Sequence, residues 1–128
     1  MLYKQQKNIK VAKLRFNKRN WIRYFDGSNK KTTIRLKKSK IGHHKAYAGS
    51  YYHPELLGEF DITKVEERIF KDLTGQDAKD DGFDNLFELQ TELVLLNGNN
   101  IKNDNTLLYK HWTENVKRII RDERTRIG

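Results

Sequence analysis

Lys30, Thr33 and Arg35 are close together in the sequence and have side chains that could perform chemistry. In an extended segment, Thr33 and Arg35 are two positions apart and therefore point to the same face. A lysine beside a threonine hydroxyl can act as a general base or bind an anion. As a base it must lose its proton, which requires burial or a nearby cation such as Lys31 to lower its pKa. The alternative is a basic rim that binds a ligand without chemistry.

Two segments, 18–24 and 45–52, interleave basic with aromatic residues. Exposed aromatic rings can stack on unpaired bases while Lys and Arg bind phosphates. Trp21 and Phe25 share an apolar helix face and are expected in the core, whereas the tyrosines of the second segment are better stacking candidates. The residues expected to contact nucleic acid are Lys30, Lys31, Arg35, Lys37, Lys38, Lys40, Lys45, Tyr47, Tyr51, Arg19 and Arg23.

The four histidines are His43, His44, His53 and His111. Adjacent histidines on an extended chain point to opposite faces, and no acidic residue stands at a metal-binding spacing from them. We therefore expect neither a metal site nor a cofactor.

Charge is distributed unevenly along the chain, whose formal net charge is +9. Residues 1–45 hold 15 Lys or Arg and one acid, whereas residues 46–104 hold 5 basic and 13 acidic residues. A segregated basic block predicts a polyanionic partner such as RNA, single-stranded nucleic acid or a nucleotide. The alternative is that the two blocks face each other and partly neutralise in the fold.

The 128 residues are the usual size of one domain and contain no cysteine. We expect a single domain over 1–128, with a core at about 9–120 and a basic tail at 121–128. The absence of cysteine excludes disulfides and thiolate zinc sites. No segment has the apolar character of a membrane span or signal peptide, which favours a cytoplasmic protein. A monomer is expected.

The first half of the chain alternates between strand patterns and one short helix. Segment 9–16 indicates a strand with a bulge near Ala12 and Lys13, and 18–25 indicates a helix that ends at Gly27. Further strands are predicted at 32–37, near 45–48, and over 57–70 with a bulge near 63–64. Loops are expected around the middle strand.

The second half predicts two capped helices. Thr74 to Asp77 has capping-box spacing and opens a helix that ends at Gly82. Asn85 to Glu88 repeats the spacing and opens a helix that ends at Asn97-Gly98. A loop follows, and the pattern after 106 fits either a helix or a closing strand. The predicted fold is α+β, with a small curved sheet or barrel of five to six strands and two or three short helices packed on it.

A family resemblance rests on two groups of residues. Gly27, Lys30 and Thr32-Thr33-Ile34-Arg35 form the first group, and 73–83 (LTGQDAKDDGF) followed by Leu86 forms the second. Their order and spacing resemble the ASCH domain family, a relative of the PUA domains, over residues 9–96. The resemblance implies a small PUA-like β-barrel with a polar cleft, and an association with RNA or nucleotides.

Some members of that family are amidohydrolases that remove an acyl group from a modified cytidine with a lysine, a threonine and a glutamate. The resemblance matches these residues to Lys30, Thr33 and Asp81. Aspartate is one methylene shorter than glutamate, which puts its reach to the substrate in doubt. We expect catalysis by Lys30, Thr33 and Asp81 only if the protein is an enzyme, and the alternative is that Asp81 caps a turn or pairs with Arg35.

Three functions are therefore expected, in descending order. The first is an RNA- or nucleotide-binding domain with a basic surface and a polar cleft. The second is a small hydrolase or RNA-processing enzyme acting on an acylated nucleoside. The third is a protein-interaction domain that uses the helix at 85–97. The third requires Leu86, Leu89, Leu93 and Leu96 to be exposed, whereas their spacing predicts that they are core.

Overall fold

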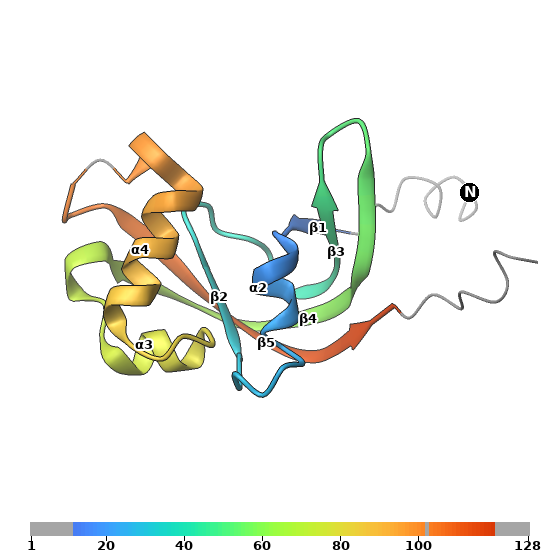
Figure 1. Cartoon of the computed structure of the whole chain (residues 1–128), viewed down its shortest axis with the longest axis horizontal. Helices are drawn as coiled ribbons and strands as arrows, with labels where there is room; N and C mark the ends of the chain where they lie inside the picture. The colour runs from blue at the N-terminus through green and yellow to red at the C-terminus, as the bar shows by residue number, and fades with distance from the viewer. Residues whose placement is uncertain (1–11, 102, 120–128) are drawn as a thin grey trace, which may run out of the picture.

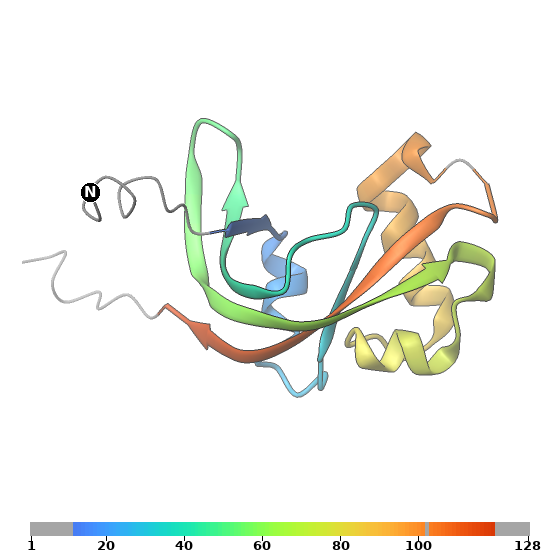
Figure 2. The ribbon, with the colours of Figure 1, turned by 180° about the vertical axis from the view of Figure 1, so that it is seen from behind.

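A mixed five-stranded sheet is the frame of the molecule. The computed structural model describes residues 12–101 and 103–119. The strands are β1 (Ala12–Arg15), β2 (Thr32–Arg35), β3 (Gly42–Gly49), β4 (Pro54–Ile69) and β5 (Leu107–Arg118). Their order is β1-β3-β4-β5-β2, and every neighbouring pair is antiparallel except β1 and β3. The expected α+β class is confirmed, but the sheet is strongly curved rather than closed into a barrel (Figures 1 and 2).

In the described part of the chain, three α-helices pack on this sheet: α2 (Lys18–Ile22), α3 (Gly75–Asp80) and α4 (Leu86–Asn97). Two short 3-10 turns, η1 (Phe70–Asp72) and η2 (Gly98–Asn100), connect them to the strands. Figure 1 shows α3 and α4 together at one end, α2 near the middle, and the β3–β4 hairpin rising at the other end. None of the helices formed by the described residues is long and apolar enough to span a bilayer.

Helices α3 and α4 begin at the capping residues that the sequence predicts. The Thr74 hydroxyl accepts a hydrogen bond from the Asp77 backbone at 3.1 Å, and the Asp77 carboxylate accepts one from the Thr74 backbone at 3.0 Å. Asn85 caps α4 by accepting from the Glu88 backbone. Because each cap satisfies a free N–H of the first turn, it fixes where the helix starts. The predicted helix at 18–25 is shorter than expected, since it ends at Ile22.

The long strand β4 has the irregularity that its broken alternation predicts. Its register against β5 shifts between Glu59 and Asp61 and again between Ile62 and Lys64. The bulge expected at Ala12 and Lys13 is wrong, because β1 pairs with β3 in an unbroken register from Ala12 onward. The remainder of that predicted strand, 9–11, and the predicted tail lie outside the described residues.

Two clusters of buried apolar side chains form the core of the described residues, which also bury several polar side chains. Phe16, Trp21 and Phe60 belong to the cluster beneath α2, whereas Ile34 and Leu89 belong to the one beneath α3 and α4. Buried polar side chains, which require hydrogen-bond partners, are Lys30, Thr32, Thr33, His44, Asp77, Asp80, Asp81, Glu92, Lys110, His111 and Thr113. Lys30, Thr32, Thr33 and Asp81 lie where β2 meets the end of α3, and they contribute to the candidate site.

Core predictions for two hydrophobic side chains need correction. Phe25 contacts the Trp21 ring at a centroid distance of 5.6 Å but is 38% exposed, because the helix has ended before it. Leu89 and Leu93 of α4 are buried as predicted, whereas Leu96 is 51% exposed. Leu96 lies near the C-terminal end of α4, where it lines a cleft instead of the core.

Candidate functional site

Lys30 and Asp81 form a buried ion pair. Lys30 lies two residues before the start of β2, and Asp81 is the C-cap residue of α3. Lys30 Nζ lies 3.2 Å from Asp81 Oδ1, and the two side chains are 2% and 8% exposed. The Thr32 hydroxyl donates to the same Oδ1 at 3.0 Å. The structure therefore brings together the two charged members of the expected catalytic trio.

The end of α3 can approach Lys30 closely because residue 82 is a glycine. Gly82 has φ +88°, a left-handed conformation that favours glycine. A Cβ at this position would lie 3.0 Å from the Lys30 Cβ. The Lys31 backbone N–H also donates to the Asp80 carbonyl at 2.6 Å. The C-terminal end of α3 therefore packs directly against the segment that leads into β2.

Burial changes the protonation equilibria of this pair. Burial lowers the pKa of Lys30, although the neighbouring Asp81 carboxylate opposes that shift. Burial likewise raises the pKa of Asp81, against the effect of Lys30. The ammonium also lies 5.2 Å from the centre of the Tyr24 ring. A lysine in these surroundings loses its proton more readily than one in water.

Thr33 and Arg35 point to the same side of β2, as their spacing predicts. Arg35 Nε donates to the Thr33 hydroxyl at 3.1 Å, and the guanidinium lies 4.5 Å from the centre of the Phe16 ring. Burial lowers the pKa of Arg35 to about 10, so it stays charged at neutral pH. The Thr33 hydroxyl is therefore paired with Arg35, and Thr32 supplies the hydroxyl that contacts Asp81.

A cleft of about 400 Å³ opens beside Arg35, between β1, β2 and the C-terminal end of α4. We call it the basic cleft. Its charged lining consists of Arg15, Arg35 and Lys37, and no acidic residue lines it among those the structure describes. Its other lining residues are Leu14, Phe16, Asn17, Thr33, Ile34, Leu36, Ser39, Leu93, Leu96, Asn97 and Asn100. Such a site is suited to an anion attached to a partly apolar group.

Two solved structures resemble this chain over most of its length. One is a protein from Enterococcus faecalis V583 described by the family model DUF984, with a TM-score of 0.66, 15% identity, and coverage of 99% of this chain and 88% of that one. The other is an ASCH domain from Lactobacillus crispatus JV V101, with a TM-score of 0.61, 12% identity, and coverage of 91% and 85%. The fold is ASCH-like. No protein-family model matches the chain, and no curated protein matches its sequence.

Within the ASCH-like fold, three residues predicted to contact nucleic acid have partners inside the protein: Lys30, in its buried pair with Asp81, Arg19 and Arg23. Arg19 Nη2 donates to both carboxylate oxygens of Glu92 in α4, each at 2.9 Å. Arg23 donates to the Gly82 carbonyl at 2.9 Å and stacks 4.3 Å from the centre of the Phe83 ring. Both arginines join α2 to the layer formed by α3 and α4. Lys31, Lys38 and Lys40 are exposed.

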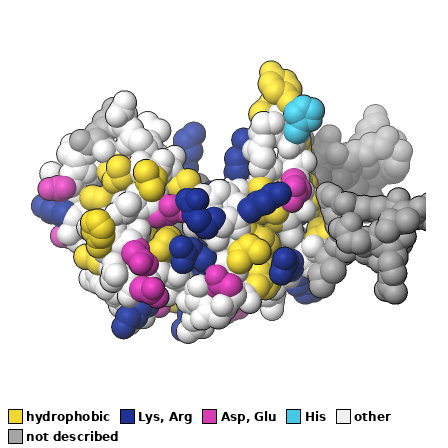
Figure 3. Space-filling view, viewed as in Figure 1, with side chains coloured by type: hydrophobic (Ala, Val, Ile, Leu, Met, Phe, Trp, Pro, Cys, Tyr) yellow, Lys and Arg dark blue, Asp and Glu magenta, His cyan; other side chains and the backbone are white. Residues whose placement is uncertain are grey.

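Figure 3 shows Lys and Arg side chains gathered across the middle of one face, between the helical end and the β3–β4 hairpin. Hydrophobic side chains lie on both sides of them and at the tip of the hairpin. On this face, the largest group of described Lys and Arg side chains therefore lies near the junction of helices and sheet.

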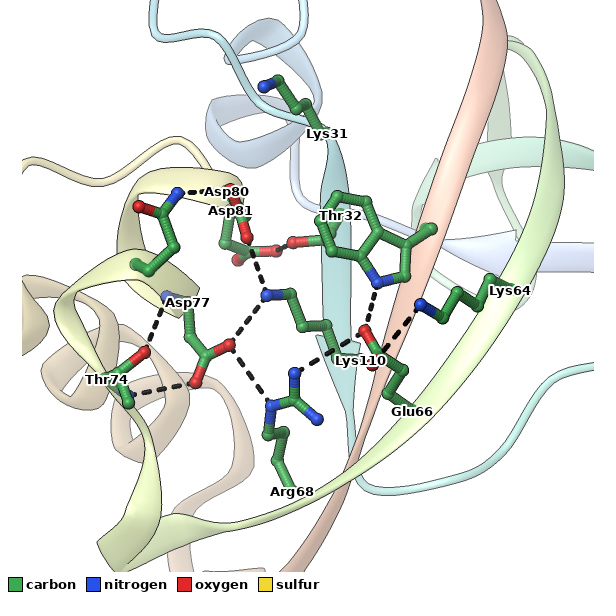
Figure 4. A network of polar contacts seen from close by, with 12 residues as sticks. Lys31, Thr32, Lys64, Glu66, Arg68, Thr74, Asp77, Asp80, Asp81 and Lys110 are labelled. Carbon is green, nitrogen blue, oxygen red and sulfur yellow. Dashed lines mark hydrogen bonds and ion pairs between the residues drawn. The ribbon is translucent and has the colours of Figure 1, made fainter.

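The sequence-based reasoning missed a second buried ion cluster, centred on Lys110 of β5. Lys110 Nζ lies 2.7 Å from Asp77 Oδ1 and 2.8 Å from Asp80 Oδ2, and its side chain is 2% exposed. Arg68 of β4 contacts Asp77 from the other side, as Figure 4 shows. The available signal was the position of Lys110 between Leu108 and Trp112, on the same face of a strand. That signal was obscured because this segment also fits a helix.

His111 has a structural role in the fold. Its Nδ1 lies 3.0 Å from the Thr33 carbonyl, and its Nε2 accepts from the Ser39 backbone at 2.9 Å. These partners select the neutral tautomer with a proton on Nδ1, and burial lowers the pKa of the ring. Across residues 12–101 and 103–119, no three His, Cys, Asp or Glu side chains are grouped to hold a metal ion.

Proposed function

We propose that this protein binds RNA and accepts one nucleotide in the basic cleft. The observation that carries the proposal is the lining of that cleft. Arg15, Arg35 and Lys37 converge on it, and none of its described lining residues is acidic. Phosphate oxygens are bound by such cations, and bidentate geometry is available from arginine. The apolar lining residues would contact the sugar or base.

Arg35 is arranged in advance for an anion. The Nε of Arg35 donates its hydrogen bond to the Thr33 hydroxyl. A phosphate would therefore be bound through the two terminal nitrogens of the Arg35 guanidinium. The Phe16 ring supports the guanidinium at 4.5 Å from its centre. A side chain that is held in its binding conformation loses less entropy when the ligand arrives.

The basic cleft keeps its charge although other parts of the basic first third are neutralised. Among the described residues, three ion pairs of Lys or Arg join residues 1–45 to the acidic middle of the chain: Lys18–Glu55, Arg19–Glu92 and Lys30–Asp81. His43 also lies beside Glu59 and Asp61. The two blocks therefore face each other in part. Arg15, Arg35 and Lys37 form no ion pair among the described residues, which leaves their field available to a polyanion.

Fluorescence anisotropy of a labelled single-stranded RNA, titrated with protein at two salt concentrations, tests the proposal. Binding should weaken steeply with salt, because the cations displace counterions from the phosphates. A duplex of the same sequence and a single-stranded DNA show whether unpaired bases and the 2′-hydroxyl contribute. Unmeasurable RNA binding at low salt would contradict the proposal.

A second candidate function is hydrolysis of an acylated nucleoside. The specific observation in its favour is the buried Lys30, whose pKa burial lowers and which lies 3.2 Å from Asp81. Lys30 would act as the base and Asp81 as its acid–base partner. Thr33 could orient water only if its hydroxyl exchanged its bond with Arg35 for one with the substrate.

Incubation with N4-acetylcytidine, followed by chromatography for free cytidine, tests this second candidate. Turnover that Lys30→Ala abolishes would support it. Turnover that survives Lys30→Ala would refute the role given to Lys30. No release of cytidine from that substrate would leave binding as the function that the site supports.

A further inference from the structure

A second pocket, between β1 and the β3–β4 hairpin, shares lining residues with the basic cleft. Its volume is about 280 Å³, close to the lower end of ligand-site volumes, about 300 Å³. It is lined by Lys13, Leu14, Arg15, Tyr47, Tyr51 and Pro54, and we call it the tyrosine pocket. Leu14 and Arg15 line both this pocket and the basic cleft. A ligand that crosses β1 could therefore occupy both.

Strand pairing places cations beside aromatic rings in this pocket. The parallel register sets Arg15 opposite Tyr47 and Lys13 opposite Lys45. Lys13 Nζ lies 5.4 Å from the centre of the Tyr47 ring. None of the described lining residues carries a negative charge. The combination of cations and rings is the one that proteins use to bind single-stranded nucleic acid, because phosphates and bases alternate along the strand.

The β3–β4 hairpin presents Tyr51 on a well-defined turn. The His53 backbone N–H donates to the Ser50 carbonyl at 3.2 Å and to its hydroxyl at 3.1 Å. Gly49 has φ +89°, and a Cβ there would lie 2.7 Å from the His53 carbonyl oxygen. The turn therefore depends on glycine at that position. Tyr51 is 78% exposed, and its ring packs edge-on against Tyr52.

We propose that the tyrosine pocket binds a second nucleotide of a single-stranded RNA whose neighbouring nucleotide lies in the basic cleft. The base stacks on Tyr51, and Arg15 contacts the phosphate that joins the two sites. This inference rests on the proposed function and extends it from one nucleotide to a strand. Single-stranded RNA is favoured over a protein segment, because both pockets are lined by cations and neither by described acidic residues.

The chain contains matched controls for this pocket. Tyr52 is adjacent to Tyr51 and similarly accessible, at 84% exposure, but does not line the pocket. Lys79 is an exposed lysine on α3, at the opposite end of the molecule from the hairpin. The comparisons are therefore Tyr51→Ala with Tyr52→Ala, and Lys13→Gln with Lys79→Gln.

Anisotropy titrations with a labelled single-stranded RNA dodecamer, and competition by the four nucleoside monophosphates, measure the effect. Tyr51→Ala should weaken dodecamer binding by about 5- to 150-fold, which corresponds to the loss of one stacked base at about 1–3 kcal/mol. Lys13→Gln should weaken it less and lower the salt dependence. Both control variants should bind like the wild type. Binding of mononucleotides to the basic cleft should change less than twofold in all four variants.

The outcomes separate this inference from the proposed function. Wild-type protein that binds neither ligand overturns both. Wild-type protein that binds the dodecamer, with Tyr51→Ala within twofold of Tyr52→Ala, overturns the tyrosine pocket and leaves the basic cleft standing. Equal losses in Tyr51→Ala and Tyr52→Ala overturn it as well, since they would indicate an effect of the hairpin tip as a whole.

Discussion

The Thr33 hydroxyl holds Arg35 in place, which makes Thr33 a positioning residue for the basic cleft. Thr33→Val removes the 3.1 Å hydrogen bond to Arg35 Nε without a large change in volume. We expect RNA binding to weaken about 2- to 10-fold, because one hydrogen bond is worth about 0.5–1.5 kcal/mol. Thr33→Ser should restore binding. Equal affinities of the two variants, measured by anisotropy, would contradict this role.

His111 should make the stability of the protein depend on pH. Burial lowers its pKa from the ordinary 6.5, so the unfolded chain takes up the proton more readily than the folded one. Its contribution is fully present above pH 6.5 and is lost as the pH falls through the lowered value. Urea unfolding across this range should show stability declining with acidity, and His111→Gln should remove much of that slope. An unchanged slope in the variant would be evidence against the assignment.

The candidate site was only partly predictable at the level of residues. Side chains alternate between the two faces of a strand, so Thr33 and Arg35, which are two positions apart, share a face. This part of the site could be predicted from the sequence. The contact between Lys30 and Asp81 was beyond local reasoning, since the two residues are 51 positions apart and meet through the packing of α3. Thr32 was overlooked as the hydroxyl that contacts Asp81 for the same reason.

At the scale of elements, the ion pairs of Lys110 with Asp77 and Asp80 connect β5 to α3. Lys110→Met leaves Asp77 and Asp80 as buried carboxylates without their shared cation. We expect a loss of about 3–5 kcal/mol in the free energy of unfolding, because breaking a buried pair leaves uncompensated charge. Lys79→Met, at an exposed position on the same helix, should change it by less than about 0.5 kcal/mol. Urea denaturation of the two variants is the comparison.

The same cluster has a defined pH dependence. Burial opposes ionisation of Asp77 and Asp80, but the hydrogen bonds from Lys110 and its charge hold the pKa of both below 3.8. Their contribution is therefore present above pH 3.8 and lost as the pH falls through the lowered folded values. The difference between wild type and Lys110→Met should shrink in that acidic range. A constant difference would contradict the electrostatic explanation.

The close approach of β4 to β5 and to the Trp21 ring of α2 requires glycine at position 58. A Cβ at Gly58 would collide with the Lys117 carbonyl and the Trp21 ring, whereas one at Gly75 would meet nothing within 4 Å. Gly58→Ala should destabilise the protein by about 3 kcal/mol through overpacking. Gly75→Ala, in the first turn of α3, should be neutral or slightly stabilising. Melting temperatures that do not separate the two variants would refute this close approach.

Elements with local signals were predictable, whereas those decided by pairing were not. The Thr74 and Asn85 caps act within one turn, so the sequence alone located both helix starts. The segment at 107–118 was ambiguous because Leu108, Trp112 and Val116 fit a helix period. Pairing with β2 and β4 on its two sides makes it a strand, and no local pattern contains that information.

At the scale of the whole molecule, charge segregation has two consequences. Part of the basic first third is paired with the acidic middle, as in Arg19–Glu92, and stabilises the fold. The cations of the basic cleft have no such partner among the described residues, and they produce the field expected to attract RNA. The net charge predicts a polyanionic partner, whereas its division between ion pairs within the fold and cations at the surface required the structure.

The most direct test of the central claim compares Lys37→Gln and Arg35→Gln, in the basic cleft, with Lys79→Gln outside it, by RNA anisotropy over a series of salt concentrations. Both cleft variants should bind more weakly than the control, and each should reduce the slope of log affinity against log salt by about one phosphate contact. Cleft variants with the affinity and slope of Lys79→Gln would show that RNA does not bind in this cleft.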